Sequence, residues 1–271
     1  MGTLAILFGS TGRLGRILAQ TLFELEIESL VITRQVLKTF IHSGHFDNIP
    51  LSTRLLIADA SVDYASIESL RQHEQDKQRL IRYLAINYPL MGVASFSSGV
   101  MDFDNSLITN PFYIAYKETK LANLAFFKSL DIPLFYPKIY TLIGPESYRV
   151  KSTGWVDVFE QASRLYHIEI GTPEDPRSWV SEETIRVIFE RFLRGVISSY
   201  IDAPVNGVFR LSDIVEFFSQ FRRLTLEIVP KVIRPWLLTH YIAPHPDCYY
   251  DDDLEAVLTR LLEHTINYPI E

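Results

Sequence analysis

The chain has 271 residues, of which 47% are apolar and 22% are charged, and its net charge is −7 at neutral pH. This balance is that of a globular protein, and the lack of any lysine- and arginine-rich run excludes a nucleic-acid partner or an anionic membrane surface. The single cysteine, Cys248, excludes an internal disulfide, and no apolar segment is long enough to span a bilayer. With no signal-peptide pattern before the first strand, we expect a cytoplasmic protein.

Strands and helices are predicted to alternate along the first half of the chain. The apolar runs predict strands at residues 4–9, 29–33, 54–59, 92–97 and 132–140. Helical spacing of apolar residues predicts helices at 13–25, 67–88 and 113–130. Strands separated by helices of this length indicate a parallel sheet with helices on both faces. After Gly144-Pro145 the pattern breaks into shorter, proline-rich pieces, which indicates a second lobe.

The sequence GSTGRLG joins the first predicted strand to the first predicted helix. Its glycine spacing places small residues where backbone amides and a helix N-terminus hold a pyrophosphate. The segment therefore predicts a dinucleotide site, although a plain glycine-rich turn is the alternative. The candidate cofactor contacts are Gly9, Ser10, Thr11, Gly12, Arg13, Leu14 and Gly15.

The end of the second strand indicates which dinucleotide binds. An acidic residue there would bond the ribose diol, whereas an arginine would pair with a 2′-phosphate. Thr33 and Arg34 occupy this place and no acid does, which favours NADP(H) over NAD(H), unless Arg34 is a solvated surface residue. Asp59 and Ala60, after the third strand, complete the predicted cofactor contacts. About 20 residues separate the second strand from the strand at 54–59, too few for a full-length helix, a further strand and their connections, so the wall on the adenine side should be trimmed.

Four segments together resemble the short-chain dehydrogenase/reductase superfamily: GSTGRLG, FSSG (96–99), AYKETKLAN (115–123) and IGPES (143–147). The resemblance is strongest to the extended branch, whose members act on nucleotide-linked sugars. It implies a doubly wound, Rossmann-type α/β fold with a smaller C-terminal substrate-binding lobe. The dinucleotide-binding domain is then expected over residues 1–143 and the lobe over 144–271, with residues 179–213 returning to pack on the first domain.

The family uses a Ser–Tyr–Lys set, and this chain contains two tyrosines that stand four residues before a lysine. Residues four apart share a helix face, so the ammonium group favours the phenolate and the tyrosine can transfer a proton. The pair Tyr116 and Lys120 matches the family better than Tyr113 and Lys117, because Thr119 precedes Lys120 and the offset from Lys120 to the Gly144-Pro145 turn is the usual one.

The remaining site residues follow from the same resemblance. Ser98 is the predicted catalytic serine, with Ser97 and Ser95 as weaker candidates. Arg177 resembles the arginine that pairs with a substrate diphosphate, unless it is a surface residue, and Tyr113, Thr141 and Ser98 are further predicted substrate contacts. The chain departs from the family pattern at three places. Glu74 stands near the place of an asparagine in the long helix, Leu124 stands where a glutamate often follows the lysine by four residues, and Lys138 stands where an arginine commonly precedes the Gly-Pro turn.

The leading functional hypothesis is an NADP(H)-dependent ketoreductase that acts on a nucleotide-activated keto-sugar. A sugar epimerase with tightly bound NAD is the second, and a non-catalytic redox sensor the third. A dehydratase is disfavoured because Gly99 and Val100, rather than an acidic pair, follow Ser98. A homodimer is left open. No metal is predicted. His240, His245, Cys248 and Asp251–Asp253 could be ligands, but the three aspartates more simply cap the helix that follows them. His42-x-x-His45 has no acidic partner.

Overall fold

The computed structural model describes residues 2–43, 49–105, 108, 110–150, 154–230, 242–249 and 252–267. The chain forms two compact units. Unit 1 contains Met1–Met101, Asn110–Lys138 and Arg186–Asp202, and unit 2 contains Asp102–Thr109, Ile139–Ile185 and Ala203–Glu271. None of the helices in the described ranges has the length and apolar character needed to cross a membrane.

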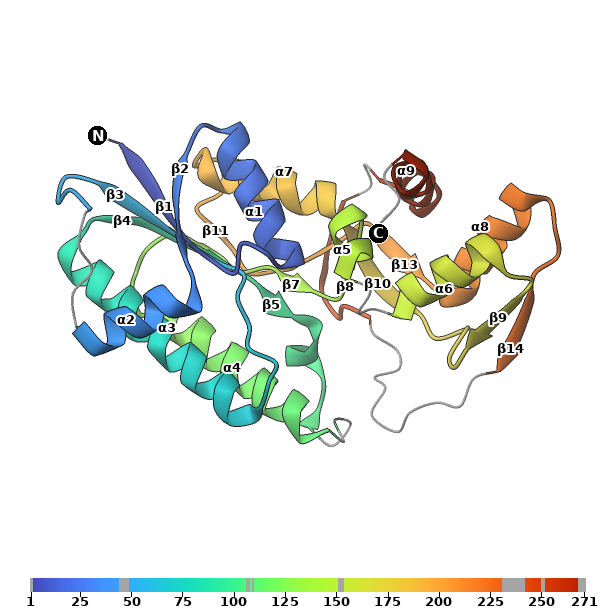
Figure 1. The fold of residues 1–271 in the computed structure, drawn as a ribbon, viewed down its shortest axis with the longest axis horizontal. Helices are drawn as coiled ribbons and strands as arrows, with labels where there is room; N and C mark the ends of the chain where they lie inside the picture. Colours follow the sequence, from blue (N-terminus) through green and yellow to red (C-terminus); the bar gives the residue numbers. More distant parts are fainter. Residues whose placement is uncertain are drawn as a thin grey trace. The chain divides into compact units, whose positions relative to one another are not determined.

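A six-stranded sheet forms the centre of unit 1, and all of its strand pairs are parallel (Figure 1). In spatial order the strands are β11 (Ser199–Tyr200), β6 (Leu134–Phe135), β4 (Leu90–Ser95), β3 (Arg54–Asp59), β1 (Thr3–Phe8) and β2 (Glu28–Ile32). The predicted doubly wound sheet is therefore confirmed. The chain leaves β1 for β2 and then crosses back to β3, so the strand order reverses at β1, where open α/β sheets bind ligands at their carboxyl ends.

Helices cover both faces of this sheet (Figure 1). One face carries α1 (Arg13–Glu24) and the part of α7 (Glu182–Leu193) that belongs to unit 1; an ion pair between Arg186 and Glu24 joins them at 3.2 Å. The other face carries α2 (Arg34–Ser43), α3 (Ile67–Asn87) and α4 (Pro111–Lys128). Apolar side chains from the strands and from α3 and α4 form the core, among them Ile6, Phe8, Ile57, Leu80, Val93 and Phe127.

Two local features of unit 1 follow directly from the sequence. Within the described residues no strand lies beyond β2, which agrees with the predicted shortage of residues on this side. Helix α4 begins at Pro111, two residues before the predicted start at 113, because the side chain of Asn110 accepts a hydrogen bond from the Phe112 amide at 3.0 Å and Pro111 occupies the first turn.

The prediction of a single strand over residues 132–140 is wrong. The segment forms β6 in the large sheet and then β7 (Lys138–Ile139), which pairs with β5 (Ser97–Ser98), before β8 (Thr141–Ile143) begins. Proline has no amide hydrogen for a sheet ladder, and Pro133 and Pro137 flank the two residues of β6. The chain therefore leaves the large sheet after only two residues.

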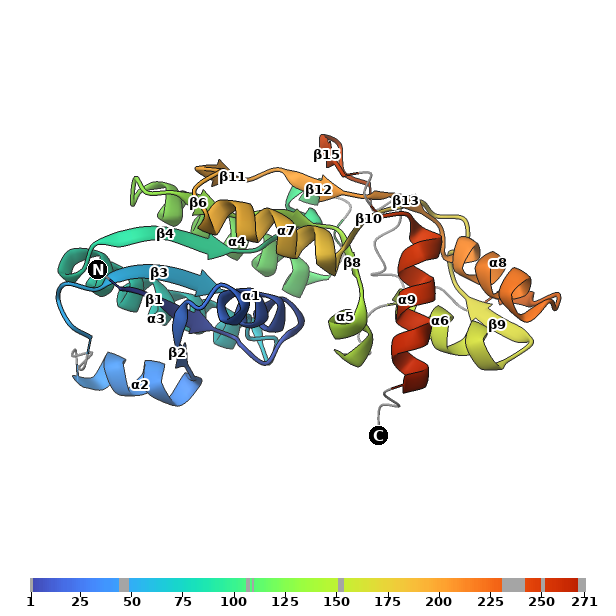
Figure 2. The ribbon, with the colours of Figure 1, turned by 90° about the horizontal axis from the view of Figure 1, so that it is seen from above.

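Unit 2 is built on a three-stranded sheet in the order β13 (Gly207–Phe209), β10 (Arg177–Ser181) and β8. Two smaller sheets pair β12 (Ala203–Val205) with β15 (Pro246–Cys248), and β14 (Glu227–Pro230) with β9 (His167–Ile170). Its helices are α5 (Pro145–Val150), α6 (Gly154–Arg164), α8 (Leu211–Arg222) and α9 (Leu254–Asn267). Figure 2 shows α6 and α8 beside β9. The core of this unit is rich in aromatic side chains, among them Trp155, Phe159 and Phe218.

Candidate active site

The glycine loop between β1 and α1 fits a dinucleotide phosphate. Gly9 has a φ of +72°, and a Cβ there would lie 2.7 Å from the Cα of Ser61. A Cβ at Gly15 would lie 1.8 Å from the carbonyl oxygen of Gly9, so neither position admits a side chain. Helix α1 starts after Gly12 with no side-chain hydrogen bond capping it. The loop thus leaves the N-terminus of α1 open to an anion.

Arg34, the residue predicted to meet a 2′-phosphate, has a carboxylate partner. Its Nη2 lies 3.4 Å from Oδ2 of Asp63, and its side chain is 64% exposed. Asp63 also accepts hydrogen bonds from Ser69 Oγ at 2.6 Å and from the Ala65 amide at 3.0 Å, and these bonds hold the pKa of its carboxyl below the usual range. Because β1 lies between β2 and β3, the ion pair links the start of α2 to the loop after β3, on either side of the glycine loop.

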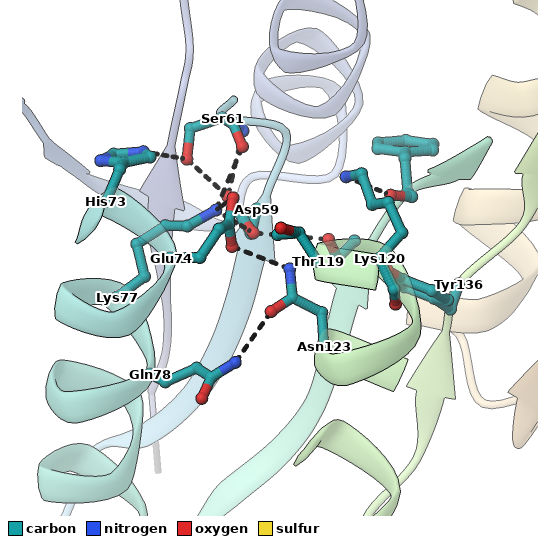
Figure 3. A network of polar contacts seen from close by, with 12 residues as sticks. Asp59, Ser61, His73, Glu74, Lys77, Gln78, Thr119, Lys120, Asn123 and Tyr136 are labelled. Atoms are coloured by element: carbon teal, nitrogen blue, oxygen red, sulfur yellow. Dashed lines mark hydrogen bonds and ion pairs between the residues drawn. The ribbon is translucent and has the colours of Figure 1, made fainter. Parts of the chain in front are cut away.

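Behind these loops, polar side chains fill a buried space between β3, α3 and α4 (Figure 3). Lys77 projects from α3 and donates to Oδ2 of Asp59 at 2.8 Å, while the Ser61 amide and hydroxyl donate to Oδ1 at 3.0 and 2.8 Å. Nζ of Lys77 also lies 2.9 Å from Oε1 of Glu74. Asp59 and Ala60 were predicted as cofactor contacts, and the Asp59 carboxylate is engaged inside the protein.

The catalytic candidate Lys120 faces the same buried space from α4. Its Nζ donates to the carbonyl oxygen of Phe96 at 2.8 Å and lies 5.5 Å from the centroid of the Tyr116 ring. Burial lowers the pKa of Lys120, and the Glu74 carboxylate is the largest opposing influence. The alternative pair, Tyr113 and Lys117, is more exposed. Tyr113 is 37% exposed, and Lys117 is half-buried whereas Lys120 is buried. The Lys120 ammonium thus lies beside the Tyr116 ring, and the assignment of this pair to catalysis stays a prediction.

Four buried ionisable groups thus share one interior region of unit 1, and none is more than 5% exposed. We refer to them as the buried charge cluster: Asp59, Glu74, Lys77 and Lys120. Sequence reasoning placed only Asp59 and Lys120 in the site. The signal for the other two lay in the spacing of α3, whose buried positions 70, 74, 77, 81 and 84 form one helical stripe that Glu74 and Lys77 interrupt with charge.

Tyr64 is a further residue that the sequence did not reveal. Its ring centroid lies 6.2 Å from that of Tyr116 and 6.0 Å from that of Phe112. The residue as a whole is 64% exposed, while burial and the neighbouring Tyr116 raise the pKa of its phenol. A second phenol therefore stands beside the proposed proton donor.

The three serines near the end of β4 have different environments. Ser95 is buried and donates to Asp59 at 3.4 Å, and Ser97 is buried and donates to the sulfur of Met101. Ser98 is only half-buried and accepts from the Val100 amide at 3.4 Å. Ser98 is therefore the most exposed of the three serines, and it lies on β5, which contacts α4.

In unit 2, the two predicted substrate contacts lie on adjacent strands of one sheet. Thr141 of β8 pairs with Trp179 of β10, and Arg177 begins β10, where its Nη2 donates to Thr172 Oγ1 at 3.4 Å. Both residues are half-buried. Within the described ranges no cluster of three potential metal ligands occurs; of the candidate ligands, His45, His240 and Asp251 lie outside those ranges.

Comparison with known proteins extends the fold assignment. No protein-family model and no curated protein sequence matches the chain. Solved structures do match over nearly its full length. An epimerase from Methanothermobacter thermautotrophicus is 12% identical with a TM-score of 0.68, and the match covers 98% of this chain and 93% of that one. A GDP-mannoheptose C4 reductase from Campylobacter jejuni with NADP bound is 12% identical with a TM-score of 0.64, covering 97% of both chains.

A third structure, the Bordetella bronchiseptica enzyme WbmG in complex with NAD and UDP, is 13% identical with a TM-score of 0.68, and the match covers 98% of this chain and 95% of that one. At these identities the likeness concerns the fold. The chain has the Rossmann-type fold of these epimerases and reductases, which is the fold that the resemblance to extended short-chain dehydrogenases/reductases implied.

Proposed function

We propose that the protein is an NADP(H)-dependent ketoreductase of a nucleotide-activated keto-sugar. The observation that carries the proposal is the Tyr116–Lys120 pair: a buried ammonium held by the Phe96 carbonyl, 5.5 Å from the centroid of the tyrosine ring. The glycine loop in the same unit supports a dinucleotide, and the solved structure of a GDP-sugar reductase with NADP bound has the same fold.

In this proposal Tyr116 donates its phenolic proton to the carbonyl oxygen of the sugar as that oxygen gains negative charge. A nicotinamide cofactor, when bound, would supply the hydride for the carbonyl carbon. Lys120 stabilises the phenolate that remains and holds the nicotinamide ribose, while Ser98 donates a hydrogen bond to the same substrate oxygen. Arg177 and Thr141 of unit 2 are proposed to contact the nucleotide part of the substrate, with the guanidinium group on the diphosphate.

A sugar epimerase is the second candidate. It is favoured by the ion pair between Arg34 and Asp63, because that arginine already has an anionic partner and a 2′-phosphate would have to compete for it. Epimerases and reductases would use the same Tyr116–Lys120 pair, but an epimerase would retain its dinucleotide through the reaction.

The nucleotide content of the purified protein separates the two candidates. We expect NADP(H) to exchange freely and NADPH to be oxidised when a panel of GDP-, UDP- and dTDP-linked keto-sugars is added, measured by the loss of NADPH absorbance. Tightly bound NAD released only on denaturation, together with interconversion of sugars without net NADPH use, would favour the epimerase. Failure to bind either dinucleotide would exclude both.

A further inference from the structure

The buried charge cluster has an arrangement that packing alone does not require. Glu74 and Lys77 occupy the buried stripe of α3 between Leu70, Leu80 and Leu84. Taking charges out of water costs free energy, and apolar residues of similar volume often stabilise a core as well or better. Two carboxylates and two ammonium groups in one interior region therefore indicate an electrostatic role.

The hydrogen bonds of the cluster tie it to the turn of α4 that carries Lys120. Asn123, one turn after Lys120, donates to Oε2 of Glu74 at 2.8 Å and accepts from Nε2 of Gln78 at 2.9 Å (Figure 3). Oε1 of Glu74 lies 2.9 Å from Nζ of Lys77 but makes no well-aligned hydrogen bond. Glu74 is thus held by Asn123 of α4 and Lys77 of α3. Its Oε2 accepts a hydrogen bond, whereas its Oε1 is stabilised by the charge of Lys77 alone.

We propose that Glu74 is a positioning residue that keeps the buried Lys120 side chain protonated. Without a compensating negative charge, a lysine this deeply buried would lose its proton far more readily than one in water. Lys77 contacts both carboxylates, at 2.8 Å from Asp59 and 2.9 Å from Glu74, so these three groups together carry one surplus negative charge, which balances the ammonium of Lys120. The role of Lys120 in the reaction rests on the proposed function, whereas the effect of Glu74 on the protonation of Lys120 does not.

The titratable groups around Lys120 come from every element packed on it. They are Asp59 of β3, Tyr64 of the loop after β3, Glu74 and Lys77 of α3, Tyr116 of α4 and Tyr136 after β6, whose hydroxyl donates to the Lys120 carbonyl. The two carboxylates favour the charged form of Lys120, and Lys77 disfavours it. Neutralising Glu74 must therefore lower the pKa of Lys120, and neutralising Lys77 must raise it.

A titration of Lys120 tests this directly. The protein is labelled with ¹³C at the lysine ε-carbon, and the Lys120 signal is assigned by its loss in Lys120→Met. We expect the midpoint of the Lys120 titration to fall by about one pH unit or more in Glu74→Gln, which keeps the shape and the oxygen acceptor of the side chain but removes its charge. The double variant Glu74→Gln/Lys77→Met removes one charge of each sign and should restore the midpoint to near the wild-type value.

Gln78→Leu is the matched control, because it removes a hydrogen bond to Asn123 from the same network without changing its charge. It should leave the Lys120 midpoint in place even if it lowers the melting temperature. An unchanged midpoint in Glu74→Gln, or no recovery in the double variant, would overturn the proposal. If Glu74→Gln does not fold, Lys77→Met decides, since its Lys120 midpoint must rise.

The pH dependence of turnover adds a second readout. In the reductive direction, activity should fall as the pH is raised through the pKa of Lys120. This fall should begin at a lower pH in Glu74→Gln than in the wild type, because Lys120 loses its proton sooner in the variant. If the wild-type protein shows no turnover or does not bind NADPH, the proposed function fails. The NMR titration then still tests the effect of Glu74 on Lys120.

Discussion

Unit 1 and unit 2 bury different kinds of polar groups. Among the described residues, every buried charged side chain belongs to unit 1, in the buried charge cluster and at Asp63. The buried polar side chains of unit 2 are all uncharged: Ser147, Thr172, Ser178, Ser181, Thr184 and Asn206. Neutral groups are satisfied by hydrogen bonds with one another, whereas buried charges need charged partners and carry a larger desolvation cost.

This difference indicates that the two units use polarity for different ends. Asn206 illustrates unit 2: its Oδ1 accepts from the Ser181 amide at 2.8 Å, and its Nδ2 donates to Thr184 Oγ1 at 2.9 Å and to the Tyr249 carbonyl at 3.1 Å. These bonds fasten β10 and α7 to a neighbouring segment. In unit 1 the charges gather at the carboxyl end of β3 and beside Tyr116, where chemistry is proposed. Changes to the charged groups around Tyr116 in unit 1 should therefore alter activity, and changes to the buried neutral groups of unit 2 should alter stability.

The largest effect is expected at Tyr116. Tyr116→Phe removes only the hydroxyl, so the fold and NADPH affinity should be retained while turnover falls by roughly 10²–10⁴-fold, as is typical for loss of a general acid. Steady-state kinetics with dinucleotide binding measured in parallel checks this. Tyr113→Phe is the matched control, three residues earlier on α4, and should cost far less. A dead Tyr113→Phe beside an active Tyr116→Phe would move the catalytic pair to Tyr113 and Lys117.

The next largest effect concerns stability in unit 2. Asn206→Ala leaves the Ser181 amide and the Tyr249 carbonyl without this partner, and should lower the free energy of unfolding by about 2–3 kcal/mol. Turnover at low temperature should be nearly unchanged. Urea unfolding provides the measurement, and Asn87→Ala is the control, since Asn87 makes an exposed bond to the Tyr83 carbonyl and should cost under about 0.5 kcal/mol. Equal losses in the two variants would contradict this account of unit 2.

The sequence allowed much of unit 1 to be predicted, because its signals are local. The glycine loop is set by close backbone approach at Gly9 and Gly15. Helical spacing brings Lys120 beside Tyr116, and the choice of this pair over Tyr113 and Lys117 came from Thr119 and the offset to Gly144-Pro145. The strand at 132–140 is interrupted for a local reason too, because Pro133 and Pro137 lack the amide hydrogen that a sheet ladder needs. Lys77 and Asp63 were missed because their partners, Asp59 and Arg34, are distant in the sequence, and no spacing rule brings those residues together.

A smaller effect is expected in unit 2 at Arg177. If its guanidinium group pairs with a substrate diphosphate, Arg177→Ala should raise the substrate KM by roughly 10–100-fold, the loss of a charge-assisted pair worth about 1.5–3 kcal/mol. NADPH affinity should not change. Arg210→Ala, at an exposed arginine of the same unit, is the control and should leave KM as it is. A raised KM would place one charged contact with the substrate in unit 2, whose interior is uncharged. An unaltered KM in Arg177→Ala would mean that Arg177 has only a structural role.

The smallest effect is expected at the exposed edge of unit 1, where Arg34 meets Asp63. Arg34→Ala should weaken NADPH binding about tenfold, roughly 1.4 kcal/mol, and leave NADH binding unchanged, because only NADPH carries the 2′-phosphate. Asp63→Asn tests the other partner: it removes the carboxylate that competes for the guanidinium and repels the phosphate, so NADPH should bind more tightly while NADH does not. Calorimetric titration of both dinucleotides into both variants gives the comparison. If Arg34→Ala weakens both dinucleotides equally, the arginine supports the loop rather than the phosphate. If Asp63→Asn weakens NADPH, the carboxylate orients Arg34 toward the phosphate instead of competing with it.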